Sequence, residues 1–218
     1  MRESNYLKEN LSKIKVSTKI VAVSKGVSLD TMIMAYNLGI RDFGENKVQE
    51  ALEKINSLPK KLKDNTHFHF IGHLQSNKVK LVVGSFCLIH SVDSLKLAKE
   101  ISKVSVSKGI TQQILLQVNN ANEKSKYGFS KEELYNSFQE IIKLPNIEVK
   151  GLMNIAPLGI GSEQLRELFK GMRLIKEDLE KKYKYKLSDL SMGMSDDYKE
   201  AIKEGATIIR IGRKIFNE

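Results

Sequence analysis

The sequence contains one cysteine, 3 Pro and no long apolar run. A lone cysteine excludes an intramolecular disulfide framework and a cysteine metal cluster, and Cys87 lies in the apolar run SFCLIH, so we expect a buried structural thiol. No apolar run approaches the roughly 20 residues of a membrane-spanning helix. The first segment, MRESNYLKENLSKIK, is charged and has no apolar signal core. We therefore expect a cytoplasmic protein without a membrane-spanning segment.

The charge is strongly positive, at +10 over 218 residues. A basic protein either binds nucleic acid or carries a solvated lysine-rich surface. The densest lysine runs, PKKLK and EKKYKYK, lie between predicted elements or at their ends and contain no recognition motif. We prefer the solvated surface and predict no nucleic-acid partner.

Short apolar runs alternate with amphipathic segments along the whole chain, and no linker divides it. The strand-like runs are KIVAVS, RDFG, HFHFI, CLIHSV, QILLQV, EVKGLM, LSDLSM and TIIRIG. Strand–helix alternation indicates right-handed crossovers and a parallel sheet. Eight units in this length predict a single-domain (β/α)8 TIM-type barrel over residues 1–218, with an N-terminal helix at about 6–14 and a truncated or absent last helix. An open doubly wound sheet is the alternative, disfavoured by the count of eight and the missing G-x-G-x-x-G motif.

The apolar run before Lys25 ends abruptly at this amine, just before a new helical pattern begins. In a barrel the active face lies at the carboxyl ends of the strands, and the first strand pairs with the eighth. Lys25 is therefore expected to share the mouth with the last two loops. A lysine that is desolvated there, near cationic neighbours, has a lowered pKa and becomes a nucleophilic amine.

The loops after the seventh and eighth predicted strands have the features of a phosphate site. In SMGMSDDYKEAI, Gly193 allows close backbone approach and Ser195 is expected to cap the following helix. In RIGR, Arg210 supplies a cation and Gly212 again allows close approach. A plain helix cap explains the first loop equally well, but its coincidence with RIGR favours phosphate. An amine beside a phosphate cradle indicates a phosphorylated carbonyl compound held as a Schiff base, either pyridoxal 5′-phosphate (PLP) or the sugar phosphate of a class I aldolase.

Seven blocks of the sequence resemble a known family. The blocks AVSKGVS, DFGENKVQE, HFIGHLQSNK, EKSKYGF, GLMNI, SMGMSDD and RIGRKIF are similar to signatures of the YggS/PROSC-type pyridoxal-phosphate homeostasis proteins, in order from about Ile20 to Phe216. The resemblance implies an alanine racemase N-terminal-domain-like barrel that binds PLP covalently. It further implies a role in vitamin B6 homeostasis, by storage of PLP or its transfer to apo PLP-dependent enzymes, without established turnover. By the same analogy we expect a monomer.

The resemblance also assigns cofactor-binding residues. It implies that Lys25 forms the Schiff base, that Ser195 binds phosphate and that Gly212 contacts the cofactor through its backbone. Arg210 is expected to meet either the phosphate or the pyridine nitrogen, and both alternatives stay open. Asn46 of the GEN motif matches a residue that lines the pocket.

The resemblance is less direct at two further positions, 213 and 126. Position 213 is often Thr or Ser in this family, and here it is arginine; we expect Arg213 to contact phosphate through its guanidinium and its backbone N–H. Lys126 of EKSKYG resembles a lysine implicated in PLP transfer, although Lys124 is close enough to compete for the assignment.

The four histidines do not indicate a metal site. His67 and His69 share one face of a strand, but no carboxylate or cysteine accompanies them at ligand spacing, so strand packing is expected for both. His73 is expected at the rim of the pocket. His90, at a strand end, is placed to hydrogen-bond within the mouth, and we assign it no role.

A PLP-dependent racemase is the enzymatic alternative. Racemisation needs acid and base groups on both faces of the substrate Cα. In alanine racemase, which the chain resembles, one group is a tyrosine from a second domain across a dimer, and we expect no such domain after Glu218. An Arg210 at the pyridine nitrogen would also weaken the electron sink. We therefore expect no catalytic residues, with weak racemase-like activity as the alternative.

Overall fold

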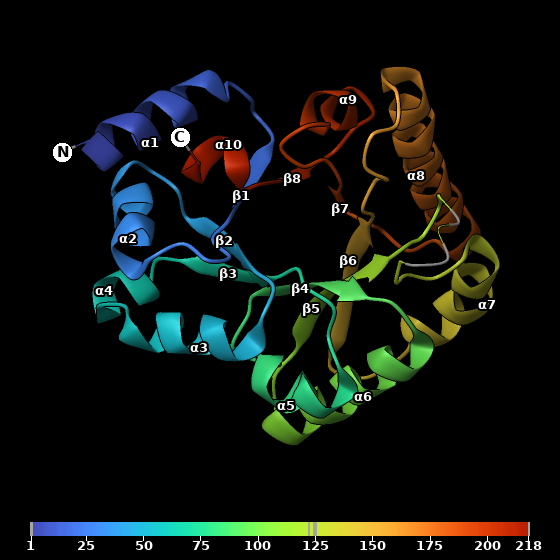
Figure 1. The fold of residues 1–218 in the computed structure, drawn as a ribbon. Helices are drawn as coiled ribbons and strands as arrows, with labels where there is room; N and C mark the ends of the chain where they lie inside the picture. Colours follow the sequence, from blue (N-terminus) through green and yellow to red (C-terminus); the bar gives the residue numbers. More distant parts are fainter. Residues whose placement is uncertain (1, 122, 124–125, 218) are drawn as a thin grey trace.

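The structure, a computed structural model, describes residues 2–121, 123 and 126–217. Its strands form one closed parallel barrel in chain order, in which the last strand pairs with the first. The helices surround this barrel on the outside (Figure 1). The predicted (β/α)8 architecture is confirmed.

All eight predicted strands are present. They are β1 (Lys19–Val23), β2 (Asp42–Glu45), β3 (His67–Phe70), β4 (Leu88–Val92), β5 (Gln112–Gln117), β6 (Ile147–Met153), β7 (Asp189–Ser191) and β8 (Ile208–Ile211). The helices are α1 (Arg2–Lys13), α2 (Leu29–Asn37), α3 (Val48–Ser57), α4 (Lys60–Lys63), the 3-10 helix η1 (Ser76–Lys78), α5 (Val79–Val82), α6 (Leu95–Lys108), α7 (Lys131–Ile141), α8 (Ser162–Tyr183), α9 (Tyr198–Lys203) and α10 (Arg213–Phe216).

Local capping explains where several helices begin and end. Ser130 precedes α7 and forms a capping box with Glu133, whose backbone N–H it accepts at 3.2 Å. Helix α6 ends at Gly109, whose positive φ of 64° is the left-handed conformation that glycine adopts without steric cost. These caps set where α6 ends and where α7 begins, and the chain after each of these helices enters the next strand, β5 or β6.

The alternation of side chains along each strand divides the apolar residues into two cores. The larger core lies between the outer face of the barrel and the helices and includes the fully buried Phe43, Phe138 and Phe169. The smaller core fills part of the barrel interior and consists of Val21, Leu88, Leu115, Met153 and Ile208. Buried polar side chains also come from the strands, among them His69, His90, Ser191 and Arg210. Such groups are stable inside a barrel only when they are hydrogen-bonded.

The two ends of the chain meet at one side of the barrel, where α1 packs beside α10 (Figure 1). The side-chain amide of Asn10 in α1 donates hydrogen bonds to the carbonyl oxygens of Ile215 at 3.3 Å and Asn217 at 3.1 Å. Helix α10 is a single short turn, as predicted for the last helix. Helix α1 begins at Arg2, earlier than the predicted start near residue 6, and packs against α10 and α2.

Two expectations about the chain surface have different outcomes. Within the described ranges, no helix combines the length and apolar character needed to cross a membrane. The expectation of a buried Cys87 is wrong, because this residue precedes β4 at the strand's amino end and its side chain is exposed. Partial desolvation, followed by the Asp42 carboxylate, still raises the pKa of the Cys87 thiol to about 12. The raised pKa keeps the thiol protonated at neutral pH, which lowers its nucleophilicity.

Candidate functional site

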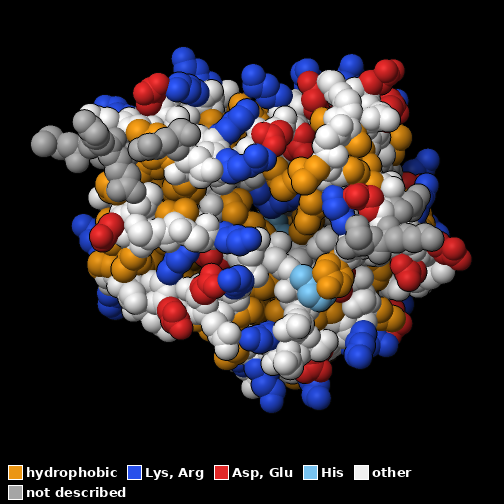
Figure 2. Space-filling model, viewed as in Figure 1, with side chains coloured by type: hydrophobic (Ala, Val, Ile, Leu, Met, Phe, Trp, Pro, Cys, Tyr) orange, Lys and Arg blue, Asp and Glu red, His pale blue; other side chains and the backbone are white. Residues whose placement is uncertain are grey.

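A cavity of about 510 Å³ lies at the carboxyl ends of β1, β7 and β8. This volume is within the range of about 300 to 1,000 Å³ that small-molecule pockets occupy. The cavity is lined by Val23, Pro157, Leu158, Gly159, Ile160, Leu165, Met194, Ser195, Asp196, Asp197, Arg210, Gly212 and Arg213. Figure 2 shows this face of the molecule, with Lys and Arg side chains on several sides of its central hollow. The position agrees with the face that barrel enzymes use for their active sites.

Four of the six predicted cofactor-binding residues line this cavity: Ser195, Arg210, Gly212 and Arg213. Lys25 follows two residues after Val23, which is itself a lining residue. Asn46 is separate from this group, because it lines a neighbouring pocket of about 270 Å³ together with His73.

Ser195 lies at the cavity but does not cap the following helix, so that expectation is wrong. Helix α9 begins at Tyr198, and its N-cap is Asp197, whose carboxylate accepts a hydrogen bond from the backbone N–H of Met194. The chain makes a turn through residues 195–197 before the helix starts. The Ser195 hydroxyl instead accepts a long hydrogen bond, 3.4 Å, from the backbone N–H of Lys214 in α10. The hydroxyl therefore faces the first turn of α10.

The two glycines of the phosphate-type loops have different roles. A Cβ atom on Gly212 would lie 3.3 Å from Cβ of Val23, so the bare backbone allows α10 to start tightly against β1. Gly193 has a φ of 94°, and a Cβ there would lie 2.7 Å from Cβ of Ala201. Gly193 thus has a packing role against α9, and its predicted role in ligand approach stays a prediction, whereas Gly212 keeps the backbone open at the cavity.

Arg210 is a buried cation that is held by neutral groups. Its Nη1 donates to Oγ of Ser191 and its Nη2 donates to the carbonyl oxygen of Asn154, both at 2.7 Å. Burial lowers the pKa of the Arg210 guanidinium to about 10, while Asp197 opposes this shift. The group is therefore still charged at neutral pH. A buried charge whose hydrogen-bond partners are neutral favours an electron-rich ligand in the adjoining cavity.

Arg213 lies at the rim of the cavity, with its side chain 65% exposed. Its guanidinium forms an ion pair with the carboxylate of Asp196, on the loop after β7. An exposed pair of this kind contributes only about 0–1 kcal/mol, so a ligand phosphate would compete with Asp196 at little cost. A phosphate contact of Arg213 stays a prediction.

Lys25 lies on an exposed turn, and the expectation of a desolvated amine is wrong. Strand β1 ends at Val23, and the following turn contains Gly26 with a φ of 71°, so the chain leaves the barrel wall before the lysine is covered. The residue before it, Ser24, is fully buried. The amine is thus accessible, while the backbone that connects Lys25 to β1 is buried at Ser24.

A buried hydrogen-bond network, which the sequence did not reveal, holds the backbone next to Lys25 in place. The Ser24 hydroxyl donates to the Glu45 carboxylate at 2.7 Å. The Lys54 ammonium donates to the same carboxylate oxygen at 2.9 Å and to the Ser24 carbonyl at 2.6 Å. The network joins β1, β2 and α3 below Lys25. Its only sequence signal was the glutamate in the GEN motif at the end of a predicted strand.

The loop between β5 and α7 contacts the other side of the mouth. Lys126 donates to the carbonyl oxygen of Ala156 at 3.1 Å and forms an ion pair with Glu123 at 2.7 Å. The ring of Tyr127 stacks on His73, with 3.6 Å between centroids. His73 is therefore at the rim, as expected. Lys124, the competing assignment for Lys126, lies outside the described residues.

The polar atoms at the mouth fit the groups of PLP. Oδ1 of Asn46 and Oδ1 of Asn154 are buried and have no hydrogen-bond partner among the residues that the structure describes. The carbonyl oxygen of Asn154 accepts a hydrogen bond from Arg210. The two hydrogen-bond partners of this guanidinium, Ser191 and Asn154, are both neutral. Unpaired buried groups of this kind are costly unless a ligand completes them. In PLP, the phosphate can accept from Arg210, and the phenolic hydroxyl or a protonated pyridine nitrogen can donate to an amide oxygen.

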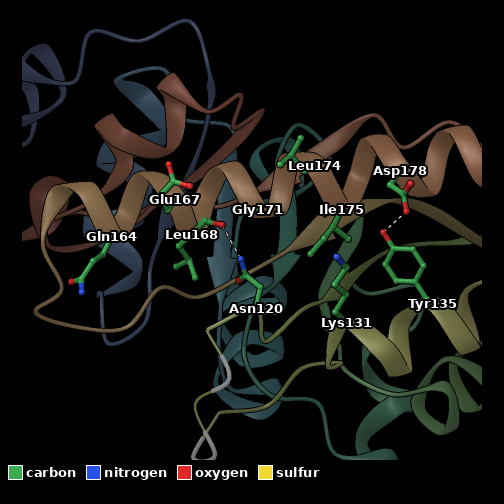
Figure 3. A pocket seen from close by; sticks show the side chains of 10 residues that line it. All are labelled: Asn120, Lys131, Tyr135, Gln164, Glu167, Leu168, Gly171, Leu174, Ile175 and Asp178. Atoms are coloured by element: carbon green, nitrogen blue, oxygen red, sulfur yellow. Dashed lines mark hydrogen bonds between the residues drawn. The ribbon is translucent and has the colours of Figure 1, made fainter.

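A larger hollow, about 820 Å³, lies outside the barrel between α7 and α8. Figure 3 shows Asn120 donating to the carbonyl oxygen of Leu168 at 2.8 Å, and Tyr135 donating to Asp178 at the other end. The hollow contains none of the six predicted residues. We treat it as a surface groove that is separate from the candidate site.

Comparison with known proteins gives consistent matches. The family model for the alanine racemase N-terminal domain matches residues 4–217. A relative from Aquifex aeolicus (strain VF5), named pyridoxal phosphate homeostasis protein, is 42% identical over 201 residues, which cover 92% of this chain and 86% of the relative. The human protein of the same name is 38% identical and covers 93% of this chain and 77% of its own length.

A solved structure extends the comparison to three dimensions. The PLP-bound structure of PipY from Synechococcus elongatus PCC7942 has a TM-score of 0.87 and 34% sequence identity, and the match covers 99% of this chain and 100% of PipY. The likeness thus includes all eight barrel units and both loops of the candidate site. The chain therefore belongs to the alanine racemase N-terminal domain family, together with the pyridoxal phosphate homeostasis proteins.

Proposed function

We propose that this protein binds PLP covalently through Lys25 and serves PLP homeostasis. The observation that carries the proposal is the contact between the end of β1 and the start of α10, where Val23 meets Gly212 at the cavity. This contact brings the turn that bears Lys25 next to the residues with phosphate-binding chemistry. The names of the relatives and the PLP in PipY support the binding of PLP and the role in its homeostasis.

Each residue at the mouth has a role in this proposal. PLP supplies an aldehyde that condenses with a lysine amine to form a C=N bond and release water. Lys25 offers the accessible amine on its fixed turn. Ser195 and the backbone at Gly212 hold the phosphate, and Arg210 supplies a positive charge from inside the barrel, directed at either the phosphate or the pyridine nitrogen.

The remaining assigned residues define the edge of the pocket. Asn46 offers its unpaired Oδ1 on the side of β2. Arg213 exchanges its exposed partner Asp196 for the phosphate. Lys126, on the loop after β5, has the role of assisting the release of PLP in this proposal.

An exposed attachment point suits a carrier better than a catalyst. A Schiff base on an exposed lysine is open to water and to other amines, which favours reversible loading and release. We therefore propose a non-catalytic carrier, monomeric and cytoplasmic, that stores PLP or delivers it to apo PLP-dependent enzymes. Weak racemase-like activity is the alternative, and incubation of the loaded protein with L-alanine, followed by chiral analysis, separates the two.

The direct test is the near-visible absorbance of the purified protein after addition of PLP. We expect a band that borohydride removes, and a reduced adduct that peptide mapping places on Lys25. The variant Lys25→Ala should lose the band and the adduct but keep the wild-type circular dichroism, because the side chain is exposed. Lys103→Ala, an exposed lysine on α6, is the matched control and should keep both. An adduct on another lysine, or no adduct, would overturn the assignment.

A further inference from the structure

A line of hydrogen-bonded side chains crosses the interior of the barrel from the candidate site to the opposite end. Arg210 contacts Oγ of Ser191 at 2.7 Å, and this oxygen lies 2.8 Å from Nδ1 of His90. Nε2 of His90 lies 3.0 Å from Nδ1 of His69, and Nε2 of His69 lies 2.9 Å from the Asp42 carboxylate. The five residues come from β8, β7, β4, β3 and β2.

When both imidazoles are neutral, the chemistry of the two ends fixes the direction of every bond. Arg210 can only donate, so Oγ of Ser191 accepts from it and its hydroxyl hydrogen is free to donate to Nδ1 of His90. His90 then carries its proton on Nε2 and donates to Nδ1 of His69. His69 in turn carries its proton on Nε2 and donates to the Asp42 carboxylate, which can only accept. In this arrangement both imidazoles are neutral and every ring nitrogen is satisfied.

The charges around the two histidines agree with neutral rings. Complete burial, followed by His69, Arg210 and Lys19, lowers the pKa of His90 well below its usual value. Burial also lowers the pKa of His69, although Asp42 opposes this shift; Lys19 and His67 add to the lowering. These neighbours lie on β1, β2, β3 and β8. A proton on Nδ1 of His69 would face the Nε2–H of His90, donor against donor, and a proton on Nδ1 of His90 would reverse the bond to the Ser191 hydroxyl.

We propose that Ser191, His90 and His69 are positioning residues that hold the Arg210 guanidinium in one orientation towards bound PLP, through a one-way hydrogen-bond line anchored on Asp42. The inference rests on the proposed PLP function. Of the five residues, only Arg210 lines the cavity, so the line can act on a ligand only through that guanidinium.

A proton path and a purely structural role explain the arrangement less well. A proton path would need a group at the mouth that both accepts and donates, and a guanidinium never accepts. For stability alone, apolar side chains of similar volume would serve equally well, since replacing a buried ionic network with packed hydrophobic residues is often neutral or stabilising. The interior of a barrel of this type is usually filled with branched apolar residues. Orientation of the one charged member at the mouth explains the polar filling.

The first test needs no cofactor. In the apo protein, nitrogen-15 chemical shifts of the imidazole rings report which nitrogen carries the proton. We expect both His69 and His90 to be neutral with the proton on Nε2, unchanged between pH 8 and pH 6. A proton on Nδ1 of either ring, or a charged His90 at pH 7, would overturn the line.

The second test measures the effect on bound PLP. In Ser191→Ala, the dissociation constant for PLP should rise about tenfold, the scale of one hydrogen bond to a charged group, and the pH profile of the near-visible band should shift. Ser191→Thr restores the hydroxyl and should restore both. Ser102→Ala, which removes a buried hydroxyl of α6 that donates to Pro145, is the control and should change neither.

The outcomes separate the two proposals. If the wild-type protein takes up no PLP, the proposed function and the positioning role both fail. If the wild-type protein binds PLP on Lys25 but Ser191→Ala keeps the wild-type dissociation constant and pH profile, the positioning role alone fails. A lower melting temperature of Ser191→Ala without a spectral change would assign the line to stability and would also overturn it.

Discussion

Ser195 illustrates how a single hydroxyl gains its position at this site. It is buried between the loop after β7 and the start of α10, and its weak hydrogen bond to the Lys214 backbone is long enough to be exchanged. A ligand phosphate would replace a 3.4 Å contact with a short, charge-assisted one. In the proposed site, the Ser195 hydroxyl would therefore gain by exchanging this contact for one with phosphate.

At the residue scale we expect Ser195→Ala to weaken PLP binding by about 1–2 kcal/mol, roughly a tenfold loss or slightly more. Equilibrium titration of the absorbance band measures the change. Ser188→Ala, an exposed serine before β7, is a suitable control that should bind as the wild type does. Wild-type affinity in Ser195→Ala would remove the hydroxyl from the phosphate site.

The sequence could predict which residues reach the mouth but not what they contact there. Lys25 and Gly212 come just after apolar runs and Arg210 lies near the end of one, and the barrel geometry alone brings the ends of such runs together. Whether a loop residue caps a helix depends on one or two residues of turn, so the predicted capping role of Ser195 is wrong, while its phosphate role stays a prediction. The exposure of Lys25 depends on the turn at Gly26, which has no signal in the apolar pattern.

At the scale of elements, the Glu45–Lys54 pair joins β1, β2 and α3. Both side chains are largely buried, with 3% and 17% exposed, and the pair also holds the Ser24 backbone. A buried carboxylate is tolerated only while its partners remain. This junction therefore determines both local stability and the placement of the Lys25 turn.

We expect Lys54→Met to lower the free energy of unfolding by about 3–5 kcal/mol, because it leaves the Glu45 carboxylate buried without its cation. Urea unfolding monitored by circular dichroism gives this value. The double variant Glu45→Gln/Lys54→Met removes both charges and should recover part of the loss. A single variant as stable as Lys103→Met would show that the carboxylate is not dependent on this lysine.

The contact between β6 and β7 gives a second element-scale prediction. A Cβ atom on Gly151 would lie 1.8 Å from the carbonyl oxygen of Asp189, so Gly151→Ala must separate the two strands. We expect a markedly lower melting temperature and a poor yield of folded protein. Gly161→Ala is the matched control, because its Cβ would lie 3.9 Å from the nearest atom and its φ of −69° suits alanine. Equal melting temperatures for the two variants would contradict the close approach.

At the scale of the whole molecule, the polar interior makes stability depend on pH. His69 and His90 are buried as neutral rings with lowered pKa values, whereas in the unfolded chain they titrate near pH 6.5. Below this pH the unfolded chain binds more protons than the folded protein, so the free energy of unfolding falls as the pH falls. The lowered pKa of Asp42 adds a loss in the same direction in more acidic solution.

We therefore expect constant stability from about pH 8 to pH 7 and a decline below about pH 6.5, with a slope of up to about 1.4 kcal/mol per pH unit for each histidine. Urea unfolding at pH 5, 6, 7 and 8 measures the slope. His90→Gln removes one titrating group and should flatten it, at some cost in stability at pH 7. An unchanged slope in this variant would exclude His90 as the source.

Much of the overall fold was accessible from the sequence because strand–helix alternation and a count of eight leave few topologies. The hydrogen-bond partners of the side chains inside the barrel could not be predicted in the same way. The histidine pattern indicated strand packing, and the pairing of Asp42 with His69 depends on the register between β2 and β3, which is set by the closed sheet. Interior partners come from strands far apart in the chain, so no local pattern reveals them.

The pairing of β1 with β8 has a consequence for the order of events during synthesis. Strand β1 leaves the ribosome well before its partner β8 (Ile208–Ile211), so one edge of the growing sheet stays open until β8 has been made. The turn that bears Lys25 and the end of β8, with Arg210 and Gly212, come side by side only when this edge closes. If the protein binds PLP here, as we propose, the complete site exists only after the barrel has closed, and PLP would be captured by the finished barrel.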